Sequence, residues 1–167
     1  EVISLLEAAR WAPSCFGYQP WRYIICDKAL NGACWTKLLE CLSEGNQSWA
    51  KNAPLLLLAT ADLKNSNNDL NKWSEYDTGA ASQNLSIQAT ALGLMVHQMG
   101  GFDVDKSRNN FKIPNRYMPM AVISVGYQLP EDKIPEEMKE REYSHRVRNS
   151  ISENFFEGEW ENPIQVS

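Results

Sequence analysis

The feature that most constrains the fold of this chain is an apolar run without a charge, residues 53–61, whose last seven letters are LLLLATA. Pro54 breaks the chain near its start and Asp62 follows its end. The run is about half as long as a membrane-spanning helix requires. We therefore predict a buried strand over residues 55–61.

The spacing of apolar residues predicts the elements around this strand. The predicted helices cover residues 2–12, 30–42, 73–99 and 105–110, and further strands cover residues 21–26 and 120–127. Helices that alternate with buried strands indicate α/β layering, in which helices cover a sheet.

The predicted helix over residues 73–99 changes from polar to small and apolar side chains, so we expect its middle to be buried nearly all round. One small sheet cannot cover so much surface, which favours helix-on-helix contact in a homodimer. A central core helix in a monomer is the alternative.

Length and charge define the class of protein further. A chain of 167 residues suits one domain over residues 1–167, with about 128–167 forming a charged C-terminal tail that covers the body or a partner. The net charge of −5 argues against binding to nucleic acid or to an anionic membrane surface. An anionic ligand therefore needs local positive groups.

The residue types that carry hydrolytic or metal chemistry are poorly represented. The chain has two histidines and four cysteines, without CxxC, HExxH, GxSxG or a phosphate-binding glycine loop, and we expect no metal site. The cysteines are interpreted as small buried hydrophobes, which suits a reducing cytoplasm. No signal peptide is visible.

Three segments are candidates for ligand binding. The first is the loop over residues 13–20, where Pro13 stiffens the backbone, Ser14 and Gln19 offer hydrogen bonds, and Gly17 permits unusual backbone angles. An ordinary helix-to-strand turn is the alternative.

The second candidate is Gly100-Gly101, where a backbone without side chains allows a flat ligand to approach. The alternative is a C-terminal helix cap, and His97 would then lie in the last helical turn as a structural or dipole partner. The third is Arg146-Val147-Arg148, a guanidinium pair suited to a phosphate, with a solvated charge run as the alternative.

These segments, in this order, resemble the nitroreductase family of FMN-dependent oxidoreductases. The matching segments are residues 6–14 (LEAARWAPS), 19–22 (QPWR), 77–81 (DTGAA), 83–85 (QNL), 91–94 (ALGL), 100–103 (GGFD), 125–127 (VGY) and 146–148 (RVR).

The resemblance implies an α+β fold with a mostly antiparallel sheet flanked by helices, and an intertwined homodimer with FMN at each subunit interface. It also implies hydride transfer from NAD(P)H through the flavin to a small acceptor such as a nitroaromatic or a quinone. Alternatives are a dimeric module without turnover, with or without flavin, and a same-fold dehalogenase or flavin-fragmenting relative.

Particular residues match the positions that hold FMN in the family. Pro13 and Ser14 match the loop that contacts the isoalloxazine and ribityl groups, and Gln19 matches its polar partner. Gly100 matches the backbone N–H that faces flavin N5, with Gly101 beside it, and Arg146 and Arg148 match the phosphate-binding pair. No side chain is nominated as a general acid or base.

Two departures from the family pattern bear on cofactor affinity. Gly17 stands where the family usually has Asn, so one contact is expected to be lost or taken over by water. The Arg-Ser-x-Arg element that members normally carry before the first helix does not precede Glu1, and a chain without it is expected to bind FMN more weakly.

Overall fold

The computed structural model describes residues 1–165, and the chain divides into two units, Glu1–Gln128 and Leu129–Ser167. The first unit contains a four-stranded sheet in the order β1-β2-β4-β3, with bounds Trp21–Asp27 for β1, Leu55–Asp62 for β2, Tyr117–Gly126 for β4 and Met95–Met99 for β3. Every pair of neighbouring strands is antiparallel. The antiparallel sheet that the family resemblance implied is therefore confirmed.

The apolar run that predicted a buried strand over residues 55–61 forms the central strand β2. All its residues are buried. Leu57 and Ala59 pack in one hydrophobic cluster and Leu56 and Leu58 in a second, because successive side chains of a strand point to opposite faces of the sheet. A sheet covered on both faces requires apolar residues at consecutive positions, so the run has no polar alternation.

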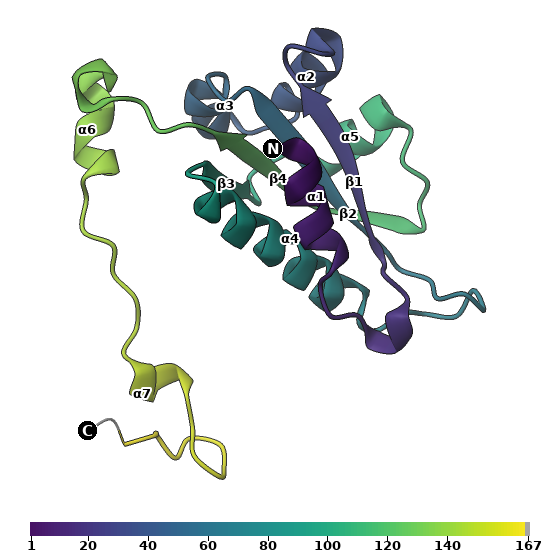
Figure 1. The fold of residues 1–167 in the computed structure, drawn as a ribbon. Helices are drawn as coiled ribbons and strands as arrows, with labels where there is room; N and C mark the ends of the chain where they lie inside the picture. Colours follow the sequence, from purple (N-terminus) through teal and green to yellow (C-terminus); the bar gives the residue numbers. More distant parts are fainter. Residues whose placement is uncertain (166–167) are drawn as a thin grey trace. The chain divides into compact units, whose positions relative to one another are not determined.

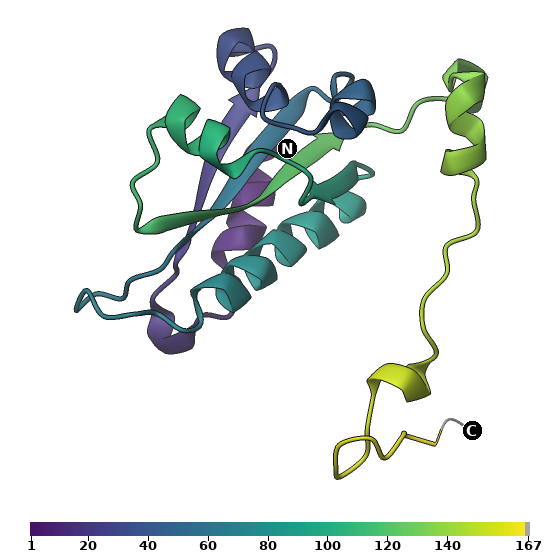
Figure 2. The ribbon, with the colours of Figure 1, turned by 180° about the vertical axis from the view of Figure 1, so that it is seen from behind.

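Helices cover both faces of this sheet (Figures 1 and 2). On one face, α1 (Val2–Arg10) and α4 (Ser74–Ala91) enclose the first cluster together with β2. On the other face, α2 (Gly32–Leu39), α3 (Glu44–Ala50) and α5 (Val104–Phe111) pack around the second. The flanked antiparallel sheet places the loop after α1 at the first turn of α4, where the candidate site lies.

The prediction of one helix over residues 73–99 is wrong at its C-terminal end. Helix α4 stops at Ala91, and Gly93 adopts a left-handed φ of 74° before the chain enters β3. Met95–Met99 pairs with β4 as an edge strand. His97 therefore lies on a strand, and Gly100-Gly101 follows a strand instead of capping a helix.

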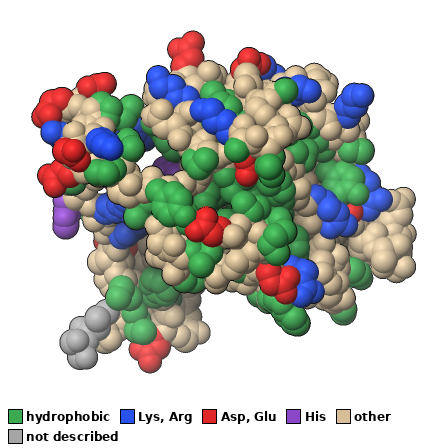
Figure 3. Space-filling model, turned by 45° about the horizontal axis from the view of Figure 1, so that its top comes forward, with side chains coloured by type: hydrophobic (Ala, Val, Ile, Leu, Met, Phe, Trp, Pro, Cys, Tyr) green, Lys and Arg blue, Asp and Glu red, His purple; other side chains and the backbone are tan. Residues whose placement is uncertain are grey.

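The expectation that the middle of this helix is buried nearly all round is also wrong within the single chain. The sheet, α1 and the Ser14 loop together cover one side of α4, and the residues buried there are Ser74, Asp77, Thr78, Ala81, Ser82, Leu85 and Ala89. On the outer side, Tyr76 is 75% exposed and Ile87 is 59% exposed. Hydrophobic side chains also gather on the surface of the first unit in Figure 3.

Helix α3 has no counterpart in the sequence prediction. Its sequence, EGNQSWA, is polar and short, and only Ala50 is fully buried, so it carries no clear apolar spacing. It forms because Ser43 and Asn46 bond to the segment after β3, a contact between residues far apart in the chain.

The second unit contains three short helical segments, η2 (Glu131–Lys133), α6 (Glu136–Glu142) and α7 (Ile151–Asn154). None of its residues up to 165 is buried. Local contacts hold its turns: Ser150 and Glu153 form a capping box at α7, and the rings of Phe156 and Trp160 meet edge to face at 5.0 Å.

Candidate functional site

The loop between α1 and β1 is the best-defined part of the candidate site. A short helical turn, η1 (Cys15–Gly17), is closed by a hydrogen bond from the Gly17 N–H to the Ser14 carbonyl at 3.0 Å. Three residues adopt positive φ angles, with Phe16 at 51°, Gly17 at 66° and Gln19 at 47°. Two of them are not glycine, so contacts around the loop must stabilise this backbone.

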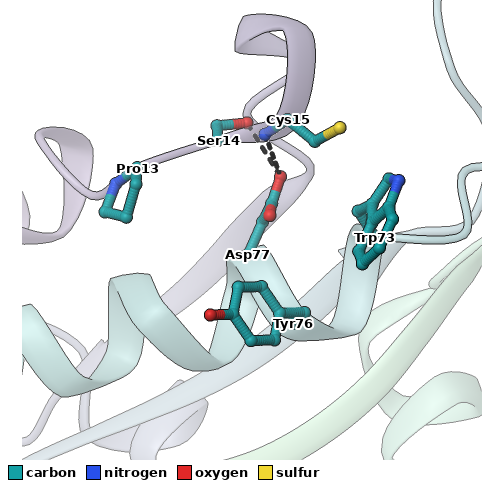
Figure 4. Close-up of a pocket in the computed structure, with 6 residues that line it drawn as sticks. All are labelled: Pro13, Ser14, Cys15, Trp73, Tyr76 and Asp77. Atoms are coloured by element: carbon teal, nitrogen blue, oxygen red, sulfur yellow. Dashed lines mark hydrogen bonds between the residues drawn. The ribbon is translucent and has the colours of Figure 1, made fainter. Parts of the chain in front are cut away.

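A buried carboxylate supplies those contacts. Asp77, in the first turn of α4, accepts hydrogen bonds from the Ser14 hydroxyl at 3.0 Å and from the Cys15 N–H at 2.9 Å (Figure 4). The Ser14 Oγ in turn accepts the Gln19 N–H at 2.8 Å. The structure thus brings Pro13, Ser14 and Gln19 together on one rigid loop, attached to α4 through Asp77.

The role of Asp77 was not predicted, although the residue lies in one of the family-like motifs. An acidic residue in the first turn of a helix is ordinarily explained by the helix dipole alone. Its partners Ser14 and Cys15 are more than 60 residues away in the chain. In the sequence, only its place at the start of the small-residue motif DTGAA could have signalled this role.

The hydrogen bonds of Ser14 also limit what its side chain offers a ligand. A hydroxyl has one donor and two acceptor positions. Its donor is directed to Asp77 and one acceptor position receives the Gln19 N–H, so one acceptor position remains. Ser14 therefore suits a ligand N–H or O–H group better than a ligand carbonyl.

An open depression of about 320 Å³ adjoins this loop. Its lining combines the loop with the start of α4: Pro13, Ser14, Cys15, Trp73, Tyr76 and Asp77 (Figure 4). Its volume lies at the lower end of the range for small-molecule sites, roughly 300–1,000 Å³. Two exposed aromatic rings, Trp73 and Tyr76, give it apolar surface suited to a flat ligand.

A second depression of about 220 Å³ lies on the other side of the loop, where Arg10, Trp11 and Gln19 contribute to its lining. Glu7 positions this arginine. It accepts hydrogen bonds from Arg10 and from the Trp11 Nε1, and these two bonds lower the pKa of Glu7 to about 2. Arg10 is therefore paired with Glu7 at the edge of the loop, and the sequence predicted no site role for it.

Asn71, just before α4, carries a buried amide that the sequence did not single out. The side chain is only 5% exposed, and its Oδ1 accepts the Trp73 N–H at 3.2 Å. Its Nδ2 has no hydrogen-bond partner among residues 1–165. A buried donor without a partner is costly, but Asn71 is not among the residues that line the two depressions, so no ligand contact is assigned to it.

The two glycines after β3 differ in what surrounds them. The Gly101 carbonyl accepts hydrogen bonds from the Ser43 N–H at 2.9 Å and from the Asn46 Nδ2 at 3.0 Å. A Cβ atom on Gly101 would lie 2.8 Å from the Asn46 Nδ2, whereas a Cβ on Gly100 would meet nothing within 4 Å. Gly101 therefore has a packing role, and Gly100 offers open backbone.

The predicted site residues do not all come together in one chain. The loop of Pro13, Ser14 and Gln19 is attached to α4, whereas Gly100 and Gly101 lie at α3, on a separate part of the fold (Figures 1 and 2). Arg146 and Arg148 belong to the second unit, on an exposed segment between α6 and α7. Arg148 donates a hydrogen bond to the Val147 carbonyl at 2.9 Å.

Two negative findings concern the described part of the chain. Across residues 1–165, no group of three or more His, Cys, Asp or Glu side chains is arranged to hold a metal ion. No helix within that range has the length and apolar content needed to cross a membrane.

Fold and site define a mixed α/β protein with an antiparallel sheet that helices cover on both faces, and with a depression lined by aromatic rings at the start of α4. The model of the nitroreductase family matches residues 1–127. The chain therefore belongs to the nitroreductase family.

Individual relatives and structures agree with this membership. An uncharacterized 15.4 kDa protein of Mycolicibacterium smegmatis is 33% identical over 129 residues, which cover 77% of this chain and 86% of that protein. A protein of Ralstonia nicotianae, provisionally named NADH dehydrogenase/NAD(P)H nitroreductase, is 27% identical over 143 residues, which cover 74% and 72%. A crystal structure described as an oxidoreductase containing FMN superimposes with a TM-score of 0.85 at 32% identity, over 96% of this chain and 82% of that one.

Proposed function

We propose that this protein is an FMN-dependent oxidoreductase that passes hydride from NAD(P)H through the flavin to a small acceptor such as a nitroaromatic or a quinone. The observation that carries the proposal is the likeness to an FMN-containing oxidoreductase over 96% of the chain. The provisional nitroreductase name of the Ralstonia nicotianae relative supports NAD(P)H as the reductant.

The residues of the chain fit FMN. The exposed rings of Trp73 and Tyr76 line the depression beside the Ser14 loop and suit a flat heterocycle. The backbone at Gly100 is open, since a Cβ atom there would meet nothing within 4 Å, which leaves it accessible to such a ring. When bound, FMN supplies a ring nitrogen, N5, that accepts and releases hydride.

Each predicted site residue has a role in this proposal. Pro13 and Ser14 contact the ring and the ribityl chain, and Gln19 holds the loop conformation around them. The Gly100 N–H stabilises negative charge on the reduced ring through a donor fixed in advance, and Gly101 keeps that backbone against α3. Arg146 and Arg148 bind the phosphate.

We propose a homodimer because the two halves of the flavin site lie on separate parts of one chain. A second copy brings its own Ser14 loop to the Gly100 backbone of the first. The exposed side chains of Tyr76 and Ile87 on α4, and of Ile3 on α1, provide apolar surface for such an association. The second unit, which has no buried residue of its own among those described, then covers the partner chain. The four cysteines are free, as suits a reducing cytoplasm, which we propose as the location.

The decisive experiment is a titration of the purified full chain with FMN, followed by NADPH in the absence of oxygen. We expect the protein to retain flavin after gel filtration, to lose the yellow colour with NADPH, and to regain it when a nitroaromatic or a quinone is added. Protein that stays colourless after incubation with FMN would refute this function and favour a flavin-free dimeric module. Bound flavin that NADPH does not bleach would favour a flavin-binding module without turnover.

A further inference from the structure

The cysteine pair Cys26 and Cys34 lies on the sheet face opposite α1 and α4. Cys26 lies near the end of β1, and Cys34 lies in the first turn of α2. Both side chains pack in or against the hydrophobic cluster of that face. Neither has a role in the proposed flavin site, whose loop is attached to α4.

The two sulfur atoms are unusually close. The Cys26 Sγ and the Cys34 Sγ are 2.7 Å apart, and both cysteines are free thiols. Non-bonded heavy atoms pack at about 3.5–4.0 Å, and the covalent S–S bond is about 2.05 Å. The sulfurs therefore lie nearer to bonding distance than to ordinary packing distance.

The turn between the two cysteines is held by hydrogen bonds. The Asp27 carboxylate accepts the Ala29 N–H at 2.8 Å and the Leu30 N–H at 3.2 Å. The Asn31 side chain caps α2 by accepting the Cys34 N–H at 3.0 Å. This network fixes the first turn of α2 over β1, so the approach of the two thiols follows from backbone geometry.

The pair is chemically asymmetric. Cys26 is 0% exposed, and burial, followed by its hydrogen bond with Cys34, raises the pKa of its thiol. Cys34 is half-buried and is therefore the more exposed residue of the pair. The greater exposure of Cys34 assigns the initial attack to it, and the raised pKa keeps Cys26 a thiol that reacts only once the Cys34 sulfur has been oxidised.

The other two cysteines have different surroundings. The Cys41 thiol donates a hydrogen bond to the Lys37 carbonyl at 3.2 Å and lies 3.5 Å from the Asn110 Nδ2, which donates to it. Cys15 lies in the ligand loop, where its N–H is bonded to Asp77. Neither has a sulfur contact like that between Cys26 and Cys34.

We propose that Cys26 and Cys34 form a reversible oxidation site that hydrogen peroxide converts to an intramolecular disulfide. The Cys34 sulfur attacks one peroxide oxygen, the O–O bond breaks, and Cys34 becomes a sulfenic acid with release of one water. The Cys26 sulfur then attacks the Cys34 sulfur, the S–O bond breaks, and the departing hydroxide takes the Cys26 proton as a second water. One peroxide is reduced and two thiols are oxidised.

Trypsin provides a direct test because each cysteine falls on its own peptide. Cleavage after Arg22, Lys28 and Lys37 places Cys26 in residues 23–28 and Cys34 in residues 29–37, apart from Cys15 and Cys41. The reduced full chain is treated with hydrogen peroxide, alkylated, digested and analysed by mass spectrometry. We expect two thiols per chain to disappear, one peptide pair joined through Cys26 and Cys34, and its complete loss on treatment with dithiothreitol.

Two single variants complete the test without replacing the fully buried cysteine. Cys34→Ser should abolish the joined peptides and leave Cys26 open to alkylation after unfolding. Cys15→Ser, which removes the other half-buried thiol, should form the joined peptides at the rate of the unchanged protein. The proposal is overturned if peroxide drives Cys34 to sulfinic acid while Cys26 stays free, if Cys26 joins Cys41 instead, or if both thiols survive. FMN is not needed for any of these measurements, so their outcome is separate from that of the proposed function.

Discussion

The two units of the chain differ in how side chains stabilise them. In the first unit, two hydrophobic clusters lie on the two faces of the sheet, and strand β2 contributes to both. In the second, none of the described residues is buried, although apolar side chains such as Val147 and Trp160 are present. The difference therefore lies in what the side chains contact and not in whether apolar residues are available.

This contrast shows which parts of the proposed site are stabilised within one chain and which need contacts with another chain. Ordering a backbone costs roughly 1–2 kcal/mol per residue, and burial of apolar surface is the main term that offsets it. The loop of Ser14 gains its order from Asp77 inside the first unit. The segment of Arg146 and Arg148 has no buried residue in its own unit, which agrees with the proposal that it contacts a partner chain and a phosphate.

The largest expected effect tests the contrast directly. Leu57→Ala removes a fully buried side chain from the central strand and should lower the free energy of unfolding by about 2–5 kcal/mol. The control, Ile151→Ala, truncates an exposed side chain of the second unit and should change it by no more than about 0.5 kcal/mol. Urea unfolding followed by circular dichroism measures both, and equal losses would contradict the distinction between the units.

A second prediction concerns the arginines of the exposed segment. Replacing Arg146 and Arg148 together with Ala should raise the Kd for FMN about 100-fold, because two charge-assisted hydrogen-bonding groups are lost at roughly 1.5 kcal/mol each. Isothermal titration with FMN gives the Kd, and urea unfolding should be unchanged. The double variant Lys133→Ala/Arg141→Ala removes the same charge from the same unit and should bind FMN normally. An unchanged Kd in the Arg146/Arg148 variant would show that the phosphate lies elsewhere.

Removing the carboxylate that attaches the Ser14 loop to α4 should have a smaller effect on the free energy of unfolding. Asp77→Ala leaves the Ser14 hydroxyl and the Cys15 N–H without their acceptor, which should cost about 1–3 kcal/mol in the free energy of unfolding. Asp77→Asn keeps one acceptor oxygen at the same place and should lose less. Urea unfolding ranks the two variants, and an Asp77→Ala chain as stable as the unchanged protein would show that the loop does not depend on this carboxylate.

The smallest effect is the pH dependence contributed by Glu7. Its hydrogen bond with Arg10 lowers the pKa from 4.5 to about 2, so the stabilisation is complete above pH 4.5 and is lost as the pH falls toward 2. Glu7→Gln should therefore lower Tm slightly at pH 7 and flatten the loss of Tm between pH 4.5 and 2. The pair is exposed, so salt should weaken the effect.

The control for this pH dependence is Glu137→Gln in the exposed helix α6, which should leave the profile unchanged. Thermal scans across the pH series, at low and high salt, compare the variants. Identical profiles for Glu7→Gln and the unchanged protein would show that the Glu7 interaction does not contribute to stability.

Much of the fold was predictable because its signals are local. The apolar run at 55–61 predicted the buried strand β2, and apolar spacing predicted α1, α2 and α5 to within a few residues. The prediction failed between residues 92 and 99, where an apolar stretch suits a helix or a strand equally well. Pairing with β4 selected the strand, and no residue within the stretch encodes that partner.

The candidate site also combines features that have a local signal in the sequence with features that depend on the fold. The loop over residues 13–20 and the glycine pair were nominated because turn-forming residues and bare backbone are visible in a sequence, and their ligand roles stay predictions. The roles of Asp77 and Arg10, and the unpartnered amide of Asn71, were not visible, because each depends on which atoms surround the side chain in the fold.

The sequence by itself therefore determined that the central strand is apolar on both faces, where the loop between α1 and β1 lies, and the family to which the motif order points. Only the tertiary structure decided where α4 ends, which carboxylate holds the Ser14 loop, and that the Cys26 and Cys34 thiols meet. The physical reason is that residue type sets solvation and backbone preference locally. Hydrogen bonds and contacts between distant segments exist only once the helices have packed on the sheet.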